Sequence, residues 1–236
     1  MFENSLIVVN IKLDNARWFL RGLNKPFDPF AQKAMHDTMI GIANCTEAVW
    51  AYHIGNEIVL YLNPNAISRC KTMLSGMTRD NLVSYIASLT TVIFNLNYGR
   101  LMEKLDKCSN IEKIRLDNYK SKQYLARFDC AVRECDRDIT PIIKTIKNTQ
   151  EILYCKIIDG SGGYKVYNAL SDVDKYGEYF ARTDIGALVK VIGEPSRTAA
   201  AFLVDVFCYD EMLRVTYLYY ERLRKQSKSK TKIEMK

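Results

Sequence analysis

Two short segments near the N-terminus carry charged side chains at positions where they could serve phosphate chemistry. Lys12 and Asp14 stand two residues apart at the end of an apolar, β-branched run, so they share one face if the backbone there is extended. Lys25 precedes Pro26, and this rigid dipeptide can hold the lysine ammonium toward a phosphate group. The alternative for Lys25 is an exposed loop lysine without a ligand.

Several other kinds of site are absent from the sequence. No dinucleotide-binding glycine motif or P-loop motif occurs, and the glycine-rich residues 159–163 lack the lysine that a P-loop requires. His36 and His53 have no Cys or Asp arrangement nearby that would indicate a triad or a zinc site. Cys130 and Cys135 have no neighbouring histidine, and their spacing is unlike that of zinc ligands.

The composition is that of a globular protein. The 236 residues are 48% hydrophobic and 26% charged, which is enough for one large domain or for one domain with an appendage. We expect no membrane span, because no run of 18 or more apolar residues occurs. The first residues do not resemble a secretory signal, and the odd number of seven cysteines suits a reducing compartment, so we expect a cytoplasmic protein.

The N-terminal half predicts alternating elements that could position these side chains. Asp28 is placed to cap a helix that begins at Pro29, and Gly55-Asn56 indicates a tight hairpin turn. A second helix is expected to start near Asp80. The periodicity predicts strands over 6–12, 48–54, 57–62 and 123–134 and helices over 29–47 and 79–105. This βαββαβ order predicts an α+β, ferredoxin-like palm, with an antiparallel sheet and helices on one face.

The C-terminal part predicts a mostly helical extension. Helical spacing occurs over 138–154 and 197–225, and the aromatic-rich residues 164–181 have no clean period. We therefore expect three parts. These are a palm domain over 1–155, a helical or irregular extension packed on the palm over 156–221, and a basic flexible tail over 222–236.

The tail carries six of the seven net positive charges of the chain. Serine and threonine alternate with its lysines, which is typical of a solvated, mobile segment. The tail either attracts nucleic-acid phosphates without sequence preference or only solubilises the chain. Its candidate nucleic-acid contacts are Arg222, Arg224, Lys225, Lys228, Lys230 and Lys232.

Residues 7–28, IVVNIKLDNARWFLRGLNKPFD, resemble the N-terminal motif of the histidine-tRNA guanylyltransferase family, enzymes that add nucleotides in the 3′-to-5′ direction. In that family a strand reading roughly I-V-V-R-I-D-G-R leads into a short helix and a G-L-N-K-P-F-D-type loop, and this loop is intact at 22–28. Residues 52–57, YHIGNE, resemble the family's second motif, Y-G-x-S-D-E. The resemblance covers about residues 6–134 and implies a palm-type nucleotidyltransferase fold.

The resemblance also shows where this chain departs from the family. Counted back without gaps from the loop, the metal-binding Asp of the first motif falls on Lys12, and that of the second motif falls on Asn56. Together these changes alter the local charge by about three units, and magnesium prefers charged oxygen donors. We therefore expect no metal or other cofactor and no catalytic residue in Lys12, Asn56 or the surviving neighbour Glu57. Asp14 and Glu57 are the fallback magnesium ligands; otherwise Asp14 caps the following helix and Glu57 is a surface hairpin residue.

Other positions carried over from the family are candidates for binding a nucleotide or a phosphate. Asn81 falls where the family commonly has a lysine that contacts the triphosphate. The lysine at position 12 could contact a phosphate in place of a metal, or it could pair with Glu57 or Asp14 and close the pocket. The candidate set is Lys12, Asn24, Lys25, Asp28 and Asn81.

Three functions remain open at this stage. The first is a catalytically degenerate palm protein that binds RNA or a nucleotide phosphate without turnover. The second is an active, magnesium-dependent 3′–5′ nucleotidyltransferase with rebuilt metal ligands, and the third is a structural or assembly protein that uses the palm as a scaffold. The two changed positions favour the first and the third. Expected partners are RNA or a nucleotide and, as the resemblance implies, further copies in a dimer or tetramer, or another protein, but no membrane.

Overall fold

The computed structural model describes residues 6–62, 77–107, 113–135, 154–155, 163–182 and 187–190 of the chain. The strands in these ranges are β1 (Leu6–Leu13), β2 (Trp50–Ile54), β3 (Glu57–Leu62), β4 (Phe128–Cys135), β5 (Glu178–Arg182) and β6 (Leu188–Lys190). The helices are α1 (Ala16–Phe19), α2 (Pro29–Cys45), α4 (Arg79–Asp106), α5 (Lys113–Lys120), α7 (Tyr164–Ala169) and α8 (Asp172–Tyr176).

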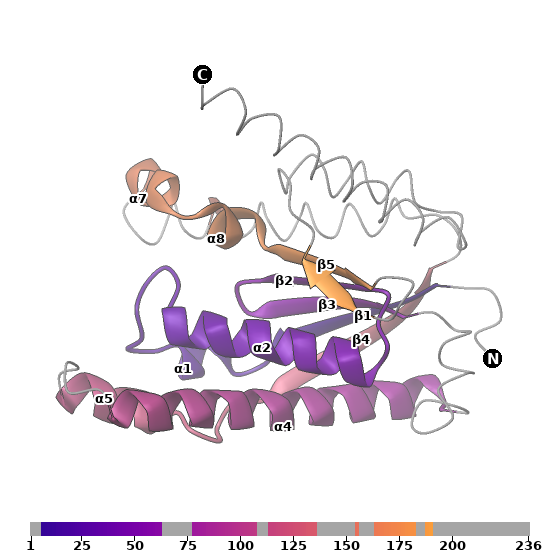
Figure 1. Cartoon of the computed structure of the whole chain (residues 1–236), viewed down its shortest axis with the longest axis horizontal. Helices are drawn as coiled ribbons and strands as arrows, with labels where there is room; N and C mark the ends of the chain where they lie inside the picture. The colour runs from indigo at the N-terminus through magenta and orange to yellow at the C-terminus, as the bar shows by residue number, and fades with distance from the viewer. Residues whose placement is uncertain are drawn as a thin grey trace.

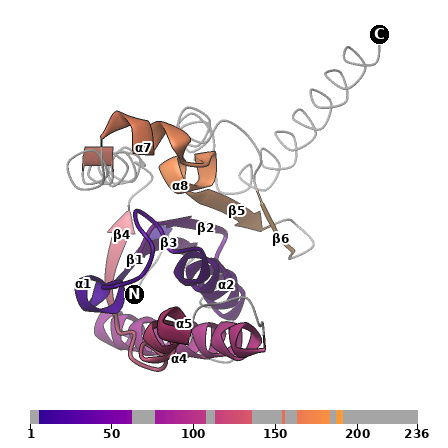
Figure 2. The same cartoon turned by 90° about the vertical axis from the view of Figure 1, so that its left-hand side faces the viewer.

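The strands form one sheet in the order β4-β1-β3-β2-β5-β6, and every neighbouring pair is antiparallel. The first four strands, with α2 and α4 between them in the chain, have the order and connections of a ferredoxin-like fold, which confirms the predicted palm. Figures 1 and 2 show α2 and α4 on one side of this sheet and α7 and α8 on the other.

Strand β1 shows how the sequence determines the two faces of the sheet. Its alternate residues face the helices and are almost fully buried, namely Ile7, Val9, Ile11 and Leu13. Asn10 and Lys12 point to the opposite face, where they are half-buried and exposed. The helix side is completed by aromatic rings, with Phe19 of α1 making edge contacts to Phe94 and Tyr98 of α4 at centroid distances of 5.5 and 5.2 Å.

Both long helices begin at a capping side chain. Asp28 accepts hydrogen bonds from the backbone N–H groups of Phe30 (3.0 Å) and Ala31 (3.1 Å), and Pro29 occupies the first helical position, as predicted. Helix α4 is capped by Thr78, whose hydroxyl accepts from the N–H of Asn81 at 3.3 Å. The predicted start of this helix at residue 79 is confirmed, but the cap is Thr78 and not Asp80, which lies within the first turn, where its charge suits the helix dipole.

The hairpin between β2 and β3 forms at the predicted Gly55-Asn56 turn. Gly55 has a φ of +57°, whereas Asn56 is not among the residues with positive φ. A positive φ at the first central residue alone is the requirement of a type II′ turn, which favours glycine there. The turn thereby sets the register in which β3 pairs with β2.

The strands β5 and β6 and the helices α5, α7 and α8 are not predicted as individual elements from the sequence. The strand β5 pairs with β2, and its residues Tyr179, Phe180 and Ala181 are all buried, so both faces are covered and the sequence shows no alternation. Gly177 precedes β5 with a φ of +84°, and a Cβ there would lie 2.4 Å from the backbone oxygen of His53. Only glycine fits this approach.

The fourth predicted strand starts later than expected. Residues 121–124 continue α5 as turns, with the N–H of Lys122 bonded to the oxygen of Tyr119 and that of Gln123 to the oxygen of Lys120. Tyr124 has a φ of +60°, which interrupts an extended backbone, so β4 begins at Phe128. The predicted helices over 138–154 and 197–225 and the basic tail fall on residues that, apart from 154, lie outside the described ranges. Among the residues that the structure describes, no helix is long and apolar enough to cross a membrane.

Candidate functional site

Lys12 and Asn56, the positions that the resemblance matches to metal ligands of the family, come together at one end of the sheet. Lys12 lies opposite Glu57 of β3 and opposite Asp129 of β4 in the strand register. Its Nζ atom lies 3.2 Å from Oε1 of Glu57, and the backbone oxygen of Asn56 accepts a hydrogen bond from the N–H of Leu13 at 3.1 Å. The structure thus places Lys12 and Glu57 side by side on the face of the sheet turned away from α2 and α4, with Asn56 in the adjoining turn.

The donors at this end do not fit the two-magnesium arrangement that the family resemblance implies. Lys12 brings an ammonium, which cannot ligate a cation, and it occupies an oxygen of Glu57. Asn56 offers only a neutral amide oxygen. Within the ranges that the structure describes, no three Asp, Glu, His or Cys side chains gather closely enough to hold a metal ion.

Asp14, the other fallback ligand, follows the strand end. Its backbone N–H donates to the oxygen of Arg127 at 2.8 Å, which continues the pairing of β1 with β4 by one residue. Asp14 does not cap α1, because the capping position belongs to Asn15. The Asn15 side chain instead bonds the oxygen of Leu125 at 2.7 Å and the N–H of Arg127 at 3.1 Å, so the alternative assignment of Asp14 as a helix cap is wrong.

The turn that carries Asn56 is anchored from the helix side of the sheet. The oxygen of Gly55 accepts hydrogen bonds from Nε2 of Gln32 on α2 (3.2 Å) and from Nε2 of His53 (3.0 Å). Burial lowers the pKa of His53 to about 4, so this ring is neutral near pH 7 and carries its proton on Nε2. The neutral ring of His53 therefore helps to hold the turn through the Gly55 oxygen.

The family-like loop at 22–28 is held mainly by α5. The second carboxylate oxygen of Asp28 accepts from the hydroxyl of Tyr119 at 2.6 Å and from the N–H of Asn24 at 3.2 Å. Burial, together with the hydrogen bond to Asp28, raises the pKa of Tyr119 to about 12. The side chain of Asn24 donates to Tyr119 at 3.3 Å and accepts from Arg115 at 2.5 Å. Asp28 is 2% exposed, so both of its oxygens serve the fold.

The remaining predicted phosphate contacts, Lys25 and Asn81, lie in different parts of the structure. Lys25 is exposed in the loop, and no acidic partner lies within ion-pair distance among the described residues. Asn81 lies in the first turn of α4, whereas the same helix meets the start of β4 at Thr91, whose hydroxyl accepts from the N–H of Phe128 at 3.2 Å. Asn81 and Thr91 are therefore separated by about 15 Å along the helix. Figure 1 shows α4 beginning at the end of the molecule opposite α5, so Asn81 is not brought to Lys12.

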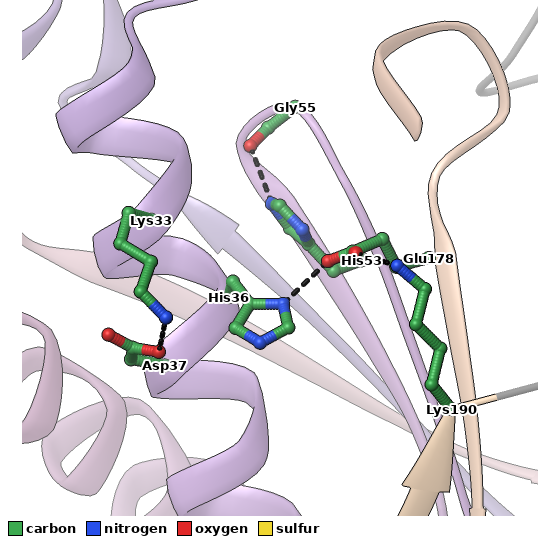
Figure 3. A network of polar contacts seen from close by, with 7 residues as sticks. All are labelled: Lys33, His36, Asp37, His53, Gly55, Glu178 and Lys190. Carbon is green, nitrogen blue, oxygen red and sulfur yellow. Dashed lines mark hydrogen bonds and ion pairs between the residues drawn. The ribbon is translucent and has the colours of Figure 1, made fainter. Parts of the chain in front are cut away.

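A polar network that no local sequence pattern indicates lies at the opposite edge of the palm. Glu178 of β5 accepts from Nδ1 of His36 on α2 at 2.5 Å and pairs with Lys190 of β6 (Figure 3). The hydrogen bond from His36 is the main reason that the pKa of Glu178 falls to about 2. This buried carboxylate joins a palm helix to the two added strands. Because 142 positions separate His36 from Glu178, no local pattern reveals the pair.

The basic tail residues predicted as nucleic-acid contacts lie outside the described ranges, so the structure does not place them. They are Arg222, Arg224, Lys225, Lys228, Lys230 and Lys232.

Comparisons with known proteins agree with this architecture. The chain is similar to a bacterial tRNA(His) guanylyltransferase (Thg1)-like protein in complex with GTP, with a TM-score of 0.62 and 19% identity over 88% of this chain and 91% of that one. A complex of such a bacterial protein with ATP gives a TM-score of 0.59 and 19% identity, covering 88% and 92%. The tRNA(His) guanylyltransferase from Saccharomyces cerevisiae gives 0.51 and 16%, covering 80% and 90%.

At these identities the similarity to solved structures shows the fold alone. A search of curated proteins found no match. The family model described as tRNAHis guanylyltransferase matches residues 1–135, which is more than half of the chain and contains the whole ferredoxin-like palm. The chain therefore belongs to the tRNA(His) guanylyltransferase family.

Proposed function

We propose that this chain binds the phosphate of a nucleotide or of an RNA end and does not catalyse magnesium-dependent nucleotide addition. The observation that carries the proposal is Lys12, which stands where the family resemblance expects a metal-binding Asp. Its side chain is 60% exposed although it pairs with Glu57, so the ammonium can still reach a ligand. An ammonium can hold a phosphate oxygen directly, as a bound cation does.

The absence of turnover follows from what an ammonium cannot do. Phosphoryl transfer by palm-type enzymes depends on metal ions that neutralise the triphosphate and activate the attacking oxygen. Lys12 neutralises charge but cannot lower the pKa of an attacking hydroxyl by coordinating it. Asn56, the second changed position, is neutral. The proposed activity is therefore binding alone.

The relatives support a nucleotide as the ligand. Two of the similar bacterial structures are complexes with GTP and with ATP. The exposed Lys25, on the loop after α1, is a second cation for the same phosphate chain. The basic tail, outside the described residues, would add sequence-independent attraction to RNA phosphates.

A second candidate function is that of a structural or assembly protein, and the Lys12–Glu57 ion pair favours it. If Glu57 holds the ammonium firmly, the pocket is closed and the palm serves as a scaffold, including for a dimer or tetramer. The third candidate, an active enzyme, requires Glu57 and Asp14 to act as rebuilt magnesium ligands. That arrangement requires breaking the pair, in which the two charges lie 3.2 Å apart.

Calorimetry with GTP in the presence of EDTA separates these candidates. We expect binding by the unmodified protein and a loss of about tenfold or more in affinity for Lys12→Ala, the size of one lost charged hydrogen bond. Lys33→Ala is the matched control, because Lys33 is 55% exposed and also forms an ion pair, with Asp37 at 2.6 Å. No detectable binding by the unmodified protein would favour the scaffold, and equal affinity in Lys12→Ala would contradict the proposal.

A further inference from the structure

We infer that the surface around α1 stacks an unpaired base of single-stranded RNA, beside the phosphate held at Lys12. This inference rests on the proposed function for the class of ligand. We call this region the α1 surface, and its residues are Arg17, Trp18, Arg21, Lys122 and Arg127.

Trp18 is the centre of the α1 surface. Its side chain lies outside the core, because Trp18 is 47% exposed whereas its neighbour Phe19 is fully buried. Nζ of Lys122 lies 4.2 Å from the centroid of the Trp18 ring and donates a hydrogen bond to the Trp18 backbone oxygen at 3.3 Å. The lysine therefore holds the indole from one side and leaves part of it open. A fixed, half-exposed indole is the kind of platform on which bases stack.

Lys122 is itself unusual. The residue is only 8% exposed, and within the described ranges no carboxylate lies within ion-pair distance of its ammonium. Its charge is compensated there only by the Trp18 oxygen and the indole ring. Burying an ammonium without a counter-charge is unfavourable, so this ammonium would gain from an anion brought close to it.

Three exposed arginines lie near this pair in the chain or through the backbone. Arg17 and Arg21 flank Trp18 in the chain, and Arg127 is joined to α1 through the hydrogen bond from its backbone N–H to Asn15 at 3.1 Å. In the part of the chain that the structure describes, none of the three takes part in an ion pair. Two exposed acids, Asp14 and Asp129, lie near them in the chain, and the four cationic side chains of the α1 surface outnumber these two acids. Aromatic stacking among free arginines is the pattern of single-strand binding.

The α1 surface lies next to the proposed phosphate site. Lys12 is the next-to-last residue of β1, the strand that leads into α1, and the chain between Lys12 and Trp18 can span at most about 20 Å. Figure 2, which views the molecule from this end, shows α1 close to β1 and β4. A short strand of RNA can therefore place a phosphate at Lys12 and a base on Trp18. A duplex would not serve, because its bases are already stacked on one another.

Tryptophan fluorescence tests the inference directly, because the chain has only two tryptophans. Trp50 is 2% exposed, so a Trp50→Phe variant leaves Trp18 as the only tryptophan reporter. We expect an unstructured oligoribonucleotide to quench this fluorescence with the same midpoint as its binding measured by anisotropy. The converse variant, Trp18→Phe with Trp50 retained, should bind the RNA without a comparable change in fluorescence.

Affinity provides the second measurement. Trp18→Ala should weaken binding of the oligoribonucleotide about tenfold, and Trp18→Phe should restore part of that loss because a phenyl ring still stacks. Ile114→Ala is the matched control, since Ile114 is an apolar side chain that is 85% exposed on α5. It should leave the affinity unchanged.

The outcomes distinguish this inference from the proposed function. Binding of RNA without quenching of Trp18, unchanged affinity in Trp18→Ala, or no binding of RNA would each overturn the α1 surface as a stacking site. If RNA quenches Trp18 but GTP fails to bind in EDTA, the stacking site stands and the phosphate site at Lys12 is lost. If GTP binding depends on Lys12 but RNA neither quenches Trp18 nor loses affinity in Trp18→Ala, the phosphate site stands and the stacking site is overturned.

Discussion

The loop at 22–28 and the end of β1 resemble parts of one family motif, yet only the loop retains the family residues. In the loop, Asp28 is buried and accepts four hydrogen bonds, from Phe30, Ala31, Asn24 and Tyr119. At the strand end, Lys12 and Glu57 form an ion pair that is partly open to solvent. The intact residue holds the fold, whereas the changed position contributes little to it. The loop can therefore persist for its structural role although the residues at the strand end differ from the motif.

The largest effect should come from the loop. Replacing Asp28 with Ala removes a helix cap and leaves the buried Tyr119 hydroxyl without its acceptor, so the free energy of unfolding should fall by about 3–5 kcal/mol. Denaturant unfolding followed by circular dichroism measures this change. The control is Asp37→Ala, an exposed acid that pairs with Lys33, and it should cost less than about 1 kcal/mol. A loss of similar size in both variants would remove the structural explanation for the intact loop.

The next effect depends on pH and tests how the turn carrying Asn56 is held. The pKa of His53 is lowered by burial from 6.5 to about 4, so the unfolded chain takes up a proton at a higher pH than the folded one. The contribution of His53 to the free energy of unfolding is therefore fully present above pH 6.5. It should decrease by about 3 kcal/mol as the pH falls to 4. In His53→Gln this part of the decrease should disappear.

Glu178 provides the contrast for this prediction. Its pKa is lowered from 4.5 to about 2, so its contribution is present above pH 4.5 and is lost below it. Glu178→Gln should therefore change the pH dependence of unfolding below pH 4.5. It should leave unchanged the decrease between pH 6.5 and 4 that belongs to His53. A decline between pH 6.5 and 4 that persists in His53→Gln would show that the ring is not held neutral.

A smaller effect is expected when the family's carboxylates are restored. In Lys12→Asp combined with Asn56→Asp, the new acid at position 12 would face Glu57 and Asp129 across the sheet. Repulsion between like charges should destabilise the variant by about 1 kcal/mol without magnesium, and added magnesium should reverse the loss. Thermal unfolding with and without magnesium measures both. The unmodified protein, as the control, should show no comparable shift; a shift of equal size there would indicate a metal site already present.

The smallest effect is expected for Lys12→Ala. The Lys12 side chain is 60% exposed and its partner Glu57 is 29% exposed, so the ion pair should contribute less than about 1 kcal/mol to stability. Denaturant unfolding of this variant, beside Asp28→Ala, makes the comparison between the two regions quantitative. A loss of several kcal/mol would instead mean that Lys12 is part of the structural framework.

The sequence predicts those features that are encoded locally. The alternation in β1, the cap at Asp28 and the turn at Gly55 each depend on residues close together in the chain, and the structure confirms all three. The strand β5 could not be predicted, because burial of Tyr179 and Phe180 on opposite faces removes the alternation that identifies a strand.

The candidate site was predictable only in part. The juxtaposition of Lys12 with Glu57 follows once the family resemblance fixes the order of the strands, and the register confirms it. The bond between His36 and Glu178 joins distant parts of the chain through the tertiary fold, so no local pattern contains it. The half-exposed position of Trp18 in α1 likewise depends on how α1 packs against Lys122 in the turn before β4.

An assay of nucleotide addition to a tRNA with GTP and ATP, across a range of magnesium concentrations, tests most directly whether this chain binds without turnover. We expect GTP binding that does not depend on magnesium and no addition by the unmodified protein at any magnesium concentration. Magnesium-dependent addition that disappears in Glu57→Ala would contradict this expectation, because Glu57 and Asp14 would then have to act as metal ligands in spite of Lys12.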